Sequence, residues 1–144
     1  GSRTVYELHG NIERNFCVRC GRHYDQPEFK TGKKVPECEC GGLIRPDVVW
    51  FGEMLPEDQF VASEAAAHKC DVMFITGTSA VVYPAAQIPL MAKEWGAWLV
   101  EVNIERTEIS NRSDFTLFGK SGEILPALLE EIKTRRENGQ KKSG

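Results

Sequence analysis

Four of the five cysteines fall in two close pairs, a spacing typical of a metal site. Two residues separate Cys17 from Cys20, and after seventeen further residues a single residue separates Cys38 from Cys40. Two short pairs on tight turns can present four thiolates in the tetrahedral arrangement that zinc prefers. Two disulfides or four unrelated thiols are the alternatives, and the intracellular character of the rest of the chain favours zinc. Because four protein ligands leave no open position, we expect a structural zinc.

Two loops carry polar residues where apolar runs end. The turn 77–79 (GTS) follows the run 72–76, and a glycine beside two hydroxyls allows a ribose or phosphate to approach a helix N-terminus. This turn alone is weak evidence, since similar turns occur in every fold of this kind. Asn103 and Glu105 follow the next run, where an amide and a carboxylate can hydrogen-bond ribose hydroxyls. A helix cap or a plain loop fits the same residues.

His9 is a candidate general base. It lies between a short β-rich segment and Gly10. A histidine is largely neutral near pH 7, yet basic enough to accept a proton from a hydroxyl. By spacing alone, a hydrogen-bonded loop histidine or a neighbour of the metal site is favoured over a catalytic role.

The segment 50–53 (WFGE) places two large aromatic residues beside a glycine at the end of an apolar run. These residues either belong to the core or form an apolar slot beside an open strand edge, which could hold an extended peptide. Composition does not decide between the two.

The composition limits the class of protein. A chain of 144 residues with 41% hydrophobic residues can form one modest core. A formal net charge of −3 argues against direct binding of nucleic acid. The sequence contains no apolar run of membrane-spanning length and no evident signal segment, so we expect a cytoplasmic protein with no membrane partner. We expect a monomer when the protein is complete.

The hydrophobic pattern predicts alternating strands and helices. Strands are expected at Thr4–Leu8, Asp47–Phe51, Val72–Thr76, Ala97–Asn103 and Phe115–Phe118, and helices from Pro56 to Ala67, Pro84 to Trp95 and Glu123 to Arg136. The run at 72–76 (VMFIT) is the clearest candidate for a buried strand. This alternation predicts an α/β fold with a Rossmann-like parallel sheet, the kind of architecture that binds dinucleotides.

The expected domain organisation places one module inside another. Residues 1–11 and 47–136 are predicted to form the Rossmann-like domain, and residues 12–46 the inserted zinc module. The polar segment 137–144 is expected to be a disordered tail.

The motifs together resemble one family, the sirtuins, which are NAD-dependent protein lysine deacylases. The resemblance rests on ELHGN at 7–11, the four-cysteine frame, IRPDVVWFGE at 44–53, GTSAVVYPAA at 77–86, VNIE at 102–105 and GKSGEILP at 119–126. These segments cover nearly the whole chain in the family's order, and they are most similar to bacterial deacetylase-type members. The resemblance identifies the chain as a C-terminal portion of a sirtuin. It implies that residues 1–11 and 47–136 are a partial NAD-binding domain, incomplete because the first βαβ half is absent.

The resemblance implies a role for each candidate residue. His9 matches the general base that acts on a ribose hydroxyl after the acyl oxygen has displaced nicotinamide from NAD. Val49, Phe51 and Gly52 match the strand segment that holds the acyl-lysine of a protein or peptide substrate, and the four cysteines match the zinc ligands. The positions that match NAD contacts are Gly77, Thr78, Ser79, Asn103, Ile104, Glu105 and Ser121.

The sequence departs from the family in one respect. It contains neither the Gly-Ala-Gly-rich phosphate loop nor the Gln-Asn-Ile-Asp segment that lines the nicotinamide pocket. We therefore expect little or no activity from these 144 residues alone. The competing hypotheses are a non-enzymatic, zinc-bearing module that binds a nucleotide or peptide, and a zinc ribbon that binds nucleic acid, which the acidic balance disfavours.

Overall fold

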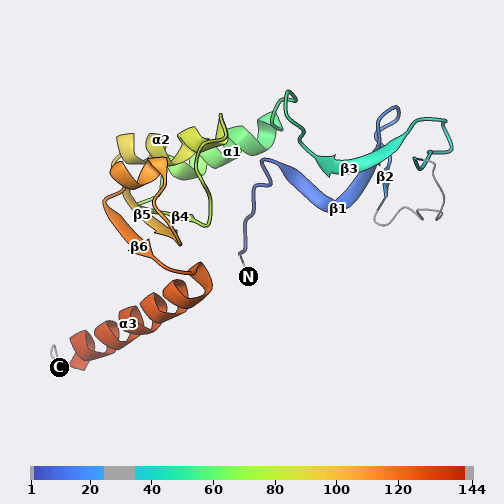
Figure 1. The fold of residues 1–144 in the computed structure, drawn as a ribbon. Helices are drawn as coiled ribbons and strands as arrows, with labels where there is room; N and C mark the ends of the chain where they lie inside the picture. The colour runs from blue at the N-terminus through green and yellow to red at the C-terminus, as the bar shows by residue number, and fades with distance from the viewer. Residues whose placement is uncertain (1, 25–34, 142–144) are drawn as a thin grey trace. The chain divides into compact units, whose positions relative to one another are not determined.

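Residues 2–24 and 35–141 are described in a computed structural model of the chain (Figure 1). The chain divides into two compact units, residues 1–62 and residues 63–144. Each unit contains its own three-stranded sheet. The domain boundaries predicted above, in which residues 12–46 interrupt a Rossmann-like domain, stay a prediction.

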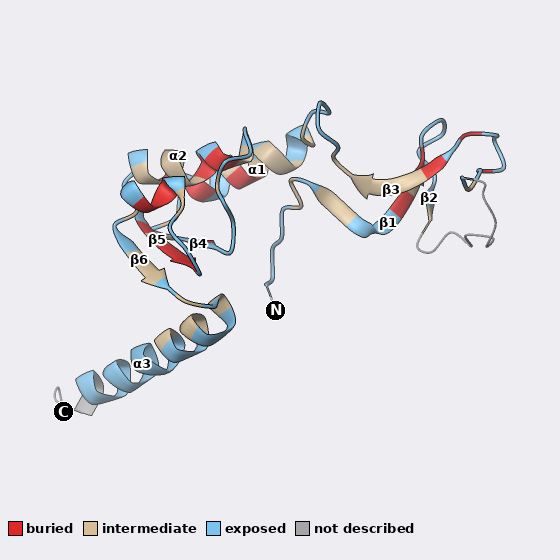
Figure 2. Cartoon of the chain, viewed as in Figure 1, coloured by how far each residue is buried: buried red, intermediate tan, exposed pale blue. Residues whose placement is uncertain are grey.

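The first unit is built on an antiparallel sheet with the order β2-β1-β3. Its strands are β1 (Gly10–Cys17), β2 (His23–Tyr24) and β3 (Ile44–Val48). The core is small: Cys17, Cys38 and Ile44 are buried, and Tyr24 packs against them. Figure 2 shows that most described residues of this unit are exposed or half-buried. So little buried apolar surface requires another source of stability, which a bound metal can supply.

The strand predicted at Thr4–Leu8 is wrong, because those residues are irregular and β1 begins at Gly10. A strand needs a partner, and the first residue to pair with β3 is Gly10, opposite Val48. The loop expected at 9–11 is therefore partly strand. The strand expected at Asp47–Phe51 instead spans Ile44–Val48, and residues 50–53 form a turn.

The second unit contains a parallel sheet with the order β4-β5-β6. Short connections and helices join the strands, as the α/β prediction requires. The chain from residue 57 onward contains α1 (Glu57–Ala67), β4 (Val72–Thr76), η1 (Ala85–Gln87), α2 (Ile88–Glu94), β5 (Trp98–Asn103), η2 (Glu108–Asn111), β6 (Phe115–Phe118) and α3 (Ser121–Lys141). The predicted α/β class with a parallel sheet is thus confirmed.

The burial predicted for β4 is wrong. Of its five residues only Ile75 is buried, whereas Val72 and Phe74 are nearly half exposed. The sheet register aligns Val72 with Trp98, so these residues share one face. Trp98 and Phe115 pack ring to ring on that face, with centroids 5.8 Å apart, and both remain more than half exposed. A run of apolar letters does not tell whether anything covers the second face of a sheet.

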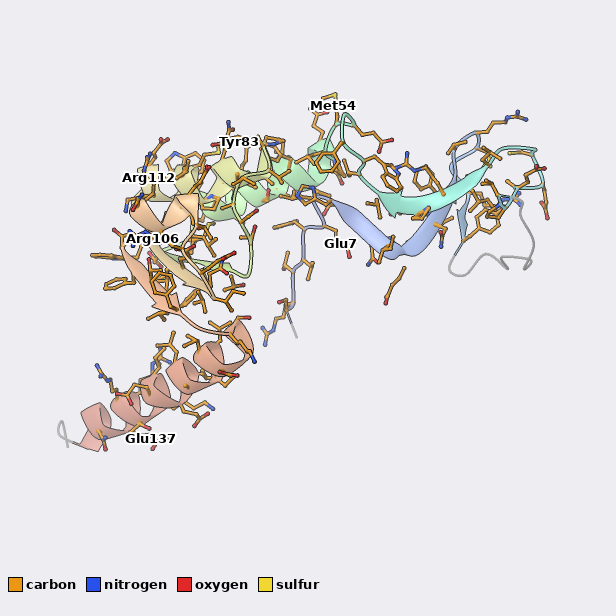
Figure 3. The ribbon with its side chains drawn as sticks, viewed as in Figure 1. Glu7, Met54, Tyr83, Arg106, Arg112 and Glu137 are labelled. Atoms are coloured by element: carbon orange, nitrogen blue, oxygen red, sulfur yellow. The ribbon has the colours of Figure 1, made fainter. Side chains whose placement is uncertain are left out.

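Two helix predictions need correction. The helix expected from Pro84 to Trp95 is divided into η1 and α2. The last helix, α3, begins at Ser121 and continues to Lys141, so the segment 137–141 is helical where a disordered tail was predicted. Glu137, for example, lies on α3 in Figure 3. Residues 142–144 lie outside the described residues. Among the helices described, none has the length and apolar character needed to cross a membrane.

Candidate functional site

The four paired cysteines form a compact cluster. Their sulfur atoms all lie within 4.8 Å of one another. The distances from Cys17 Sγ to Cys40 Sγ and from Cys20 Sγ to Cys38 Sγ are 3.5 and 3.7 Å. Four sulfurs on a tetrahedron with zinc–sulfur bonds of about 2.3 Å would be about 3.8 Å apart. The cluster fits a structural zinc ion, and none of the four cysteines is in a disulfide.

Two similar backbone turns build the cluster. The Gly21 N–H donates to the Cys17 carbonyl (2.9 Å), and the Gly41 N–H donates to the Cys38 carbonyl (2.8 Å). Each turn therefore closes around one short cysteine pair. At Gly42 an added Cβ would lie 2.6 Å from Cys17 Sγ, so only glycine allows the backbone to pass this close to the sulfur.

Hydrogen bonds within the cluster distribute charge unequally over the sulfurs. The Tyr24 hydroxyl and then the Cys40 N–H lower the pKa of Cys38 to about 6. The Gly42 N–H lowers the pKa of Cys40, but its Cys17 and Cys38 neighbours outweigh this and raise it to about 12. Four thiols this close cannot all ionise without a counter-charge, and a divalent cation supplies one.

His9 lies directly before β1, with its side chain exposed. The Gly10 N–H donates to the Glu7 carbonyl (3.0 Å), and the Val49 N–H donates to the His9 carbonyl (3.0 Å). Gly10 has φ +75°, and a Cβ there would lie 2.0 Å from the Asp47 carbonyl oxygen. Only glycine fits so close to the facing strand. The register therefore places the candidate base, His9, directly beside Val49 of the candidate substrate segment.

The turn 50–53 is held in place by Arg45, and its Phe51 side chain is exposed. Arg45 forms a two-point ion pair with Glu53 (2.5 and 3.0 Å), and its guanidinium lies 5.6 Å from the centre of the Trp50 ring. The Arg45 hydrogen bonds and then the Trp50 N–H hold the pKa of Glu53 below its usual value. Phe51 is 97% exposed, and Gly52 adopts φ +91°. Of the two interpretations of this segment, the one that places it in the core is therefore wrong for Phe51 within the described chain.

The second unit contains a cavity of about 630 Å³ between the turn after β4 and the loop after β5. An adjoining cavity of about 260 Å³ shares three lining residues with it and extends to the first residues of α3. All seven residues expected to contact NAD line one or both cavities: Gly77, Thr78, Ser79, Asn103, Ile104, Glu105 and Ser121. Residues from three separate segments of the sequence thus meet at the carboxyl ends of the three parallel strands β4, β5 and β6.

Asn103 has a structural task in this cavity. Its Nδ2 donates to the Thr78 carbonyl (2.8 Å), and its Oδ1 accepts the N–H of Ile104 (2.9 Å). The residue is only 8% exposed. Both ends of the amide are engaged, so Asn103 holds the turn 77–79 against the end of β5.

Sequence reasoning missed a buried carboxylate beneath the same loop. Glu101 is fully buried, and its two oxygens accept hydrogen bonds from the hydroxyls of Thr107 and Ser110. The Thr107 N–H also donates to the Ser110 hydroxyl (2.9 Å). Arg106, labelled in Figure 3, donates to Asn111 in the same loop (2.8 Å). The available signal was a single carboxylate inside an otherwise apolar strand, followed by two hydroxyl residues.

The predicted residues gather in three groups. The four cysteines form the first, and His9 with the segment 49–52 forms the second; both belong to the first unit. The third group lines the cavities of the second unit. Each group can be described by its own geometry, and each offers a different chemistry: metal binding, proton transfer beside a strand edge, and nucleotide binding.

Comparison with protein families and curated proteins finds sequence relatives. The Sir2 family model matches residues 1–84. The chain is 50% identical over 143 residues to "NAD-dependent protein deacylase 2" of Pyrobaculum aerophilum, covering 97% of this chain and 56% of the relative. It is also 50% identical over 139 residues to "NAD-dependent protein deacylase" of Pyrococcus furiosus, covering 92% of this chain and 56% of the relative. The chain therefore spans little more than half the length of these curated relatives.

Solved structures show the same similarity. A Sir2 homologue in complex with NAD superposes with a TM-score of 0.87 at 38% identity, covering 94% of this chain and 53% of the other. Sir2Tm bound to a propionylated peptide superposes with a TM-score of 0.85 at 36% identity, covering 92% of this chain and 58% of the other.

Proposed function

Because the chain belongs to the Sir2 family, we propose that it is part of an NAD-dependent protein lysine deacylase that removes acetyl groups. In that reaction NAD and water are co-substrates, the acyl oxygen displaces nicotinamide, and the products are free lysine, nicotinamide and O-acyl-ADP-ribose. The observation that carries the proposal is the hydrogen bond from Val49 to His9. It joins a candidate base to a candidate peptide-binding segment through the backbone.

His9 would act as the general base. Its imidazole is exposed, so it can accept a proton from a ribose hydroxyl brought to this face. The backbone on both sides of His9 is held by hydrogen bonds at Gly10 and Val49. A fixed backbone limits the directions in which the ring can point, which favours proton transfer in one geometry.

The segment 49–52 would hold the acyl-lysine. Val49 follows directly after β3, and Phe51 and Gly52 are exposed on the braced turn. An extended peptide could add its backbone to this segment, while the Phe51 ring supplies an apolar contact for the acyl-lysine side chain. The solved relative Sir2Tm binds a propionylated peptide, which supports an acylated peptide as the substrate here.

The cavities of the second unit would bind NAD, mainly its adenosine half. Glycine at position 77 leaves the backbone of the turn accessible, and Thr78, Ser79 and Glu105 offer hydroxyl and carboxylate groups for ribose and base. Ser121 begins α3, so the smaller cavity includes a helix N-terminus. The solved Sir2 homologue described above is a complex with NAD, which supports the same co-substrate here.

The zinc would have a structural role, held by Cys17, Cys20, Cys38 and Cys40. We further propose a cytoplasmic, monomeric protein that does not bind nucleic acid. A reducing compartment suits four free thiols, and a net charge of −3 disfavours attraction to phosphate backbones.

Turnover of an acetyl-lysine peptide with NAD, followed by mass spectrometry, tests the proposal. We expect little turnover from these 144 residues, and robust turnover when they are extended with the N-terminal half of a Sir2-family relative. In the extended protein His9→Ala should reduce turnover by about 100-fold or more, as loss of a general base does. His23→Ala, at an exposed histidine of the same unit, is the matched control and should leave turnover within about twofold.

Two outcomes would contradict the proposal. If the extended protein binds ADP-ribose but releases no nicotinamide, it is a binding module and not an enzyme. If His9→Ala retains full turnover, another residue is the base.

A further inference from the structure

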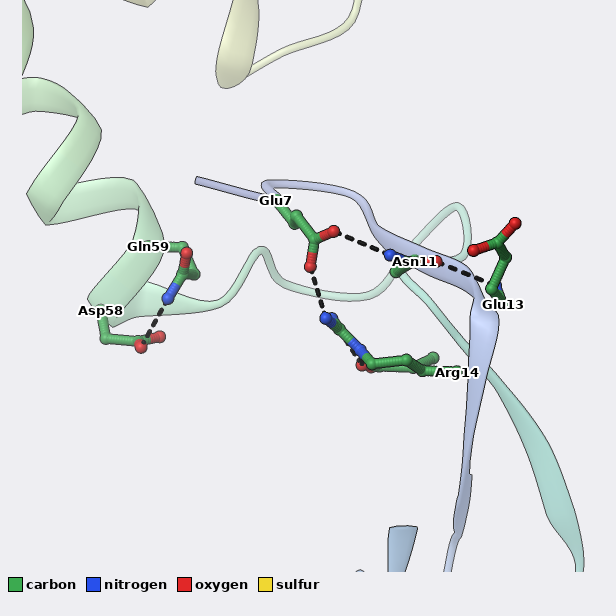
Figure 4. A network of polar contacts seen from close by, with 7 residues as sticks. Glu7, Asn11, Glu13, Arg14, Asp58 and Gln59 are labelled. Carbon is green, nitrogen blue, oxygen red and sulfur yellow. Dashed lines mark hydrogen bonds and ion pairs between the residues drawn. The ribbon is translucent and has the colours of Figure 1, made fainter. Parts of the chain in front are cut away.

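A chain of polar contacts connects the residues on both sides of His9 with the strand that faces it. Asn11 Nδ2 donates to Glu7 Oε1 (2.8 Å), and Arg14 Nη1 pairs with Glu7 Oε2 (2.6 Å). The same guanidinium pairs with Asp47 Oδ2 on β3, from Nη2 at 3.0 Å and Nε at 3.1 Å. Figure 4 shows Glu7 between Asn11 and Arg14. We call Glu7, Asn11, Arg14 and Asp47 the Glu7 network.

An irregularity in the sheet makes this network possible. Asn11 pairs with Asp47 and Asn15 pairs with Pro46, so the three residues 12–14 of β1 have no partner on β3. The Asn11 side chain also accepts the N–H of Glu13 inside this bulge (2.9 Å). The extra residues bend β1 and bring Arg14 back toward Glu7 and Asp47. Bulges of this kind often re-aim a side chain beside a functional site.

The network encloses the turn that carries His9. Glu7 lies two residues before His9 and Asn11 two residues after it, and their side chains bond to each other. Asp47 lies two residues before Val49, whose N–H donates to the His9 carbonyl. Arg14 therefore links the turn to the strand, because its guanidinium contacts Glu7 before the turn and Asp47 on β3 directly. The Asn11 hydrogen bond and then the Arg14 pair hold the pKa of Glu7 below its usual value, so it is ionised at neutral pH.

We propose that the Glu7 network is a positioning device that fixes the His9 turn against the segment 49–52. Its members do not touch the reacting atoms; they act through His9 and Val49. The catalytic part of this inference rests on the proposed deacylase function. A guanidinium suits this work better than a lysine ammonium. It contacts Glu7 and Asp47 from separate nitrogen atoms of one rigid plane, whereas a lysine would have to reach both carboxylates from a single nitrogen.

The ordinary alternative is a set of surface ion pairs with no effect on the turn. Partly exposed pairs contribute little to stability individually, and the Arg14 side chain is 46% exposed. The same unit offers a matched control, the pair between Arg22 and Glu39, which is equally short at 2.6 Å. That pair bonds near the cysteines and has no contact with the His9 turn among the described residues.

Amide hydrogen exchange on this chain tests the device without any need for turnover. Glu7→Gln, Arg14→Lys and Arg14→Ala should raise exchange about three- to tenfold at the Gly10 and Val49 amides, because the bonds that close the turn open more often. They should also shift the NMR signals of the His9 ring. Arg22→Ala should change neither. Protected amides of Gly21 and Gly41 confirm that each variant keeps its cysteine turns.

Unchanged exchange at Gly10 and Val49 would overturn the proposal, as would an equal rise in Arg22→Ala. In the extended protein used above, Arg14→Lys should lower kcat by about tenfold with little change in the KM for NAD. Full kcat in Arg14→Lys, together with loss of activity in His9→Ala, would also overturn it. Absence of turnover in every variant would refute the deacylase function, and the exchange data would then still decide whether the network fixes the turn.

Discussion

Each of the two units is expected to be stabilised in a different way. In the first unit the buried apolar cluster comprises Cys17, Cys38 and Ile44, and two of these three belong to the four-cysteine cluster that fits a zinc ion. In the second unit Leu99 and Val102 are completely buried in a parallel sheet with helical connections. Stability therefore depends on a coordinated ion in one unit and on apolar packing in the other.

The difference has a functional consequence. The candidate base and peptide segment lie in the unit that depends on the metal, whereas the nucleotide cavities lie in the unit that depends on packing. Losing the metal should disable proton transfer and peptide binding while leaving nucleotide contacts in place. A structural zinc ion would thus affect the proposed catalysis without taking part in it.

The largest expected effect is that of removing the zinc. Chelation, or Cys38→Ser, should unfold the first unit, because its small core cannot replace about 10 kcal/mol or more of metal-binding free energy. Amide protection should disappear at Val18 and Gly21 and persist at β5. The measurement is hydrogen exchange with and without chelator, together with the zinc content of the purified protein.

The control for zinc removal is Cys70→Ser, which alters the cysteine outside the cluster. If the purified protein contains no zinc, or if chelation reduces amide protection equally in both units, the two units do not differ in their dependence on metal.

The second largest effect should come from Glu101→Ala, in the packing-dependent unit. The substitution leaves the hydroxyls of Thr107 and Ser110 without their buried acceptor and opens a cavity, at a cost of about 2–4 kcal/mol. The loop that lines the nucleotide cavity should loosen, so affinity for ADP-ribose should fall. Thermal unfolding and calorimetric titration with ADP-ribose measure the two effects.

Glu105→Ala serves as the control for stability, since its side chain is exposed at the edge of the same loop. The role assigned to Glu101 is incorrect if its variant melts at the wild-type temperature. A loss of zinc from the Glu101 variant would show that the two units are not independently stabilised.

The smallest expected effect is the pH dependence that Asp114 contributes to the stability of the second unit. The Lys93 ammonium, at 2.8 Å, and then the Leu99 N–H lower the pKa of Asp114 from its usual value. A depressed folded-state pKa gives stability that is fully present above the unfolded value, near 4, and is lost as pH falls through the folded value. Denaturant unfolding between about pH 2 and pH 6 should show this loss, and Asp114→Asn should flatten that part of the curve. A wild-type slope in Asp114→Asn would assign the dependence to other carboxylates.

Local sequence patterns were sufficient to predict several features of the structure. The cysteine spacing predicted the metal cluster, because each pair is closed by a turn of a few residues. The bounds of β4 and β6 match the expected Val72–Thr76 and Phe115–Phe118, since short apolar runs bounded by polar or glycine residues determine both. The loop pattern indicated five of the seven nucleotide positions and the resemblance added Ile104 and Ser121. The carboxyl ends of neighbouring parallel strands bring all seven together.

Tertiary structure decided the rest. Nothing near Gly10 in the sequence shows that β1 starts there, because its partner Val48 lies beyond the whole metal module. The bulge that turns Arg14 toward Glu7 and Asp47 depends on the same long-range register. Glu101 meets its hydroxyl partners because Thr107 and η2 lie against β5 in the folded unit. The sequence alone determined the two cysteine turns and the bounds of β4 and β6, since these depend on neighbouring residues. Which side chains meet, and therefore how His9 is held, depended on pairings between residues far apart in the chain.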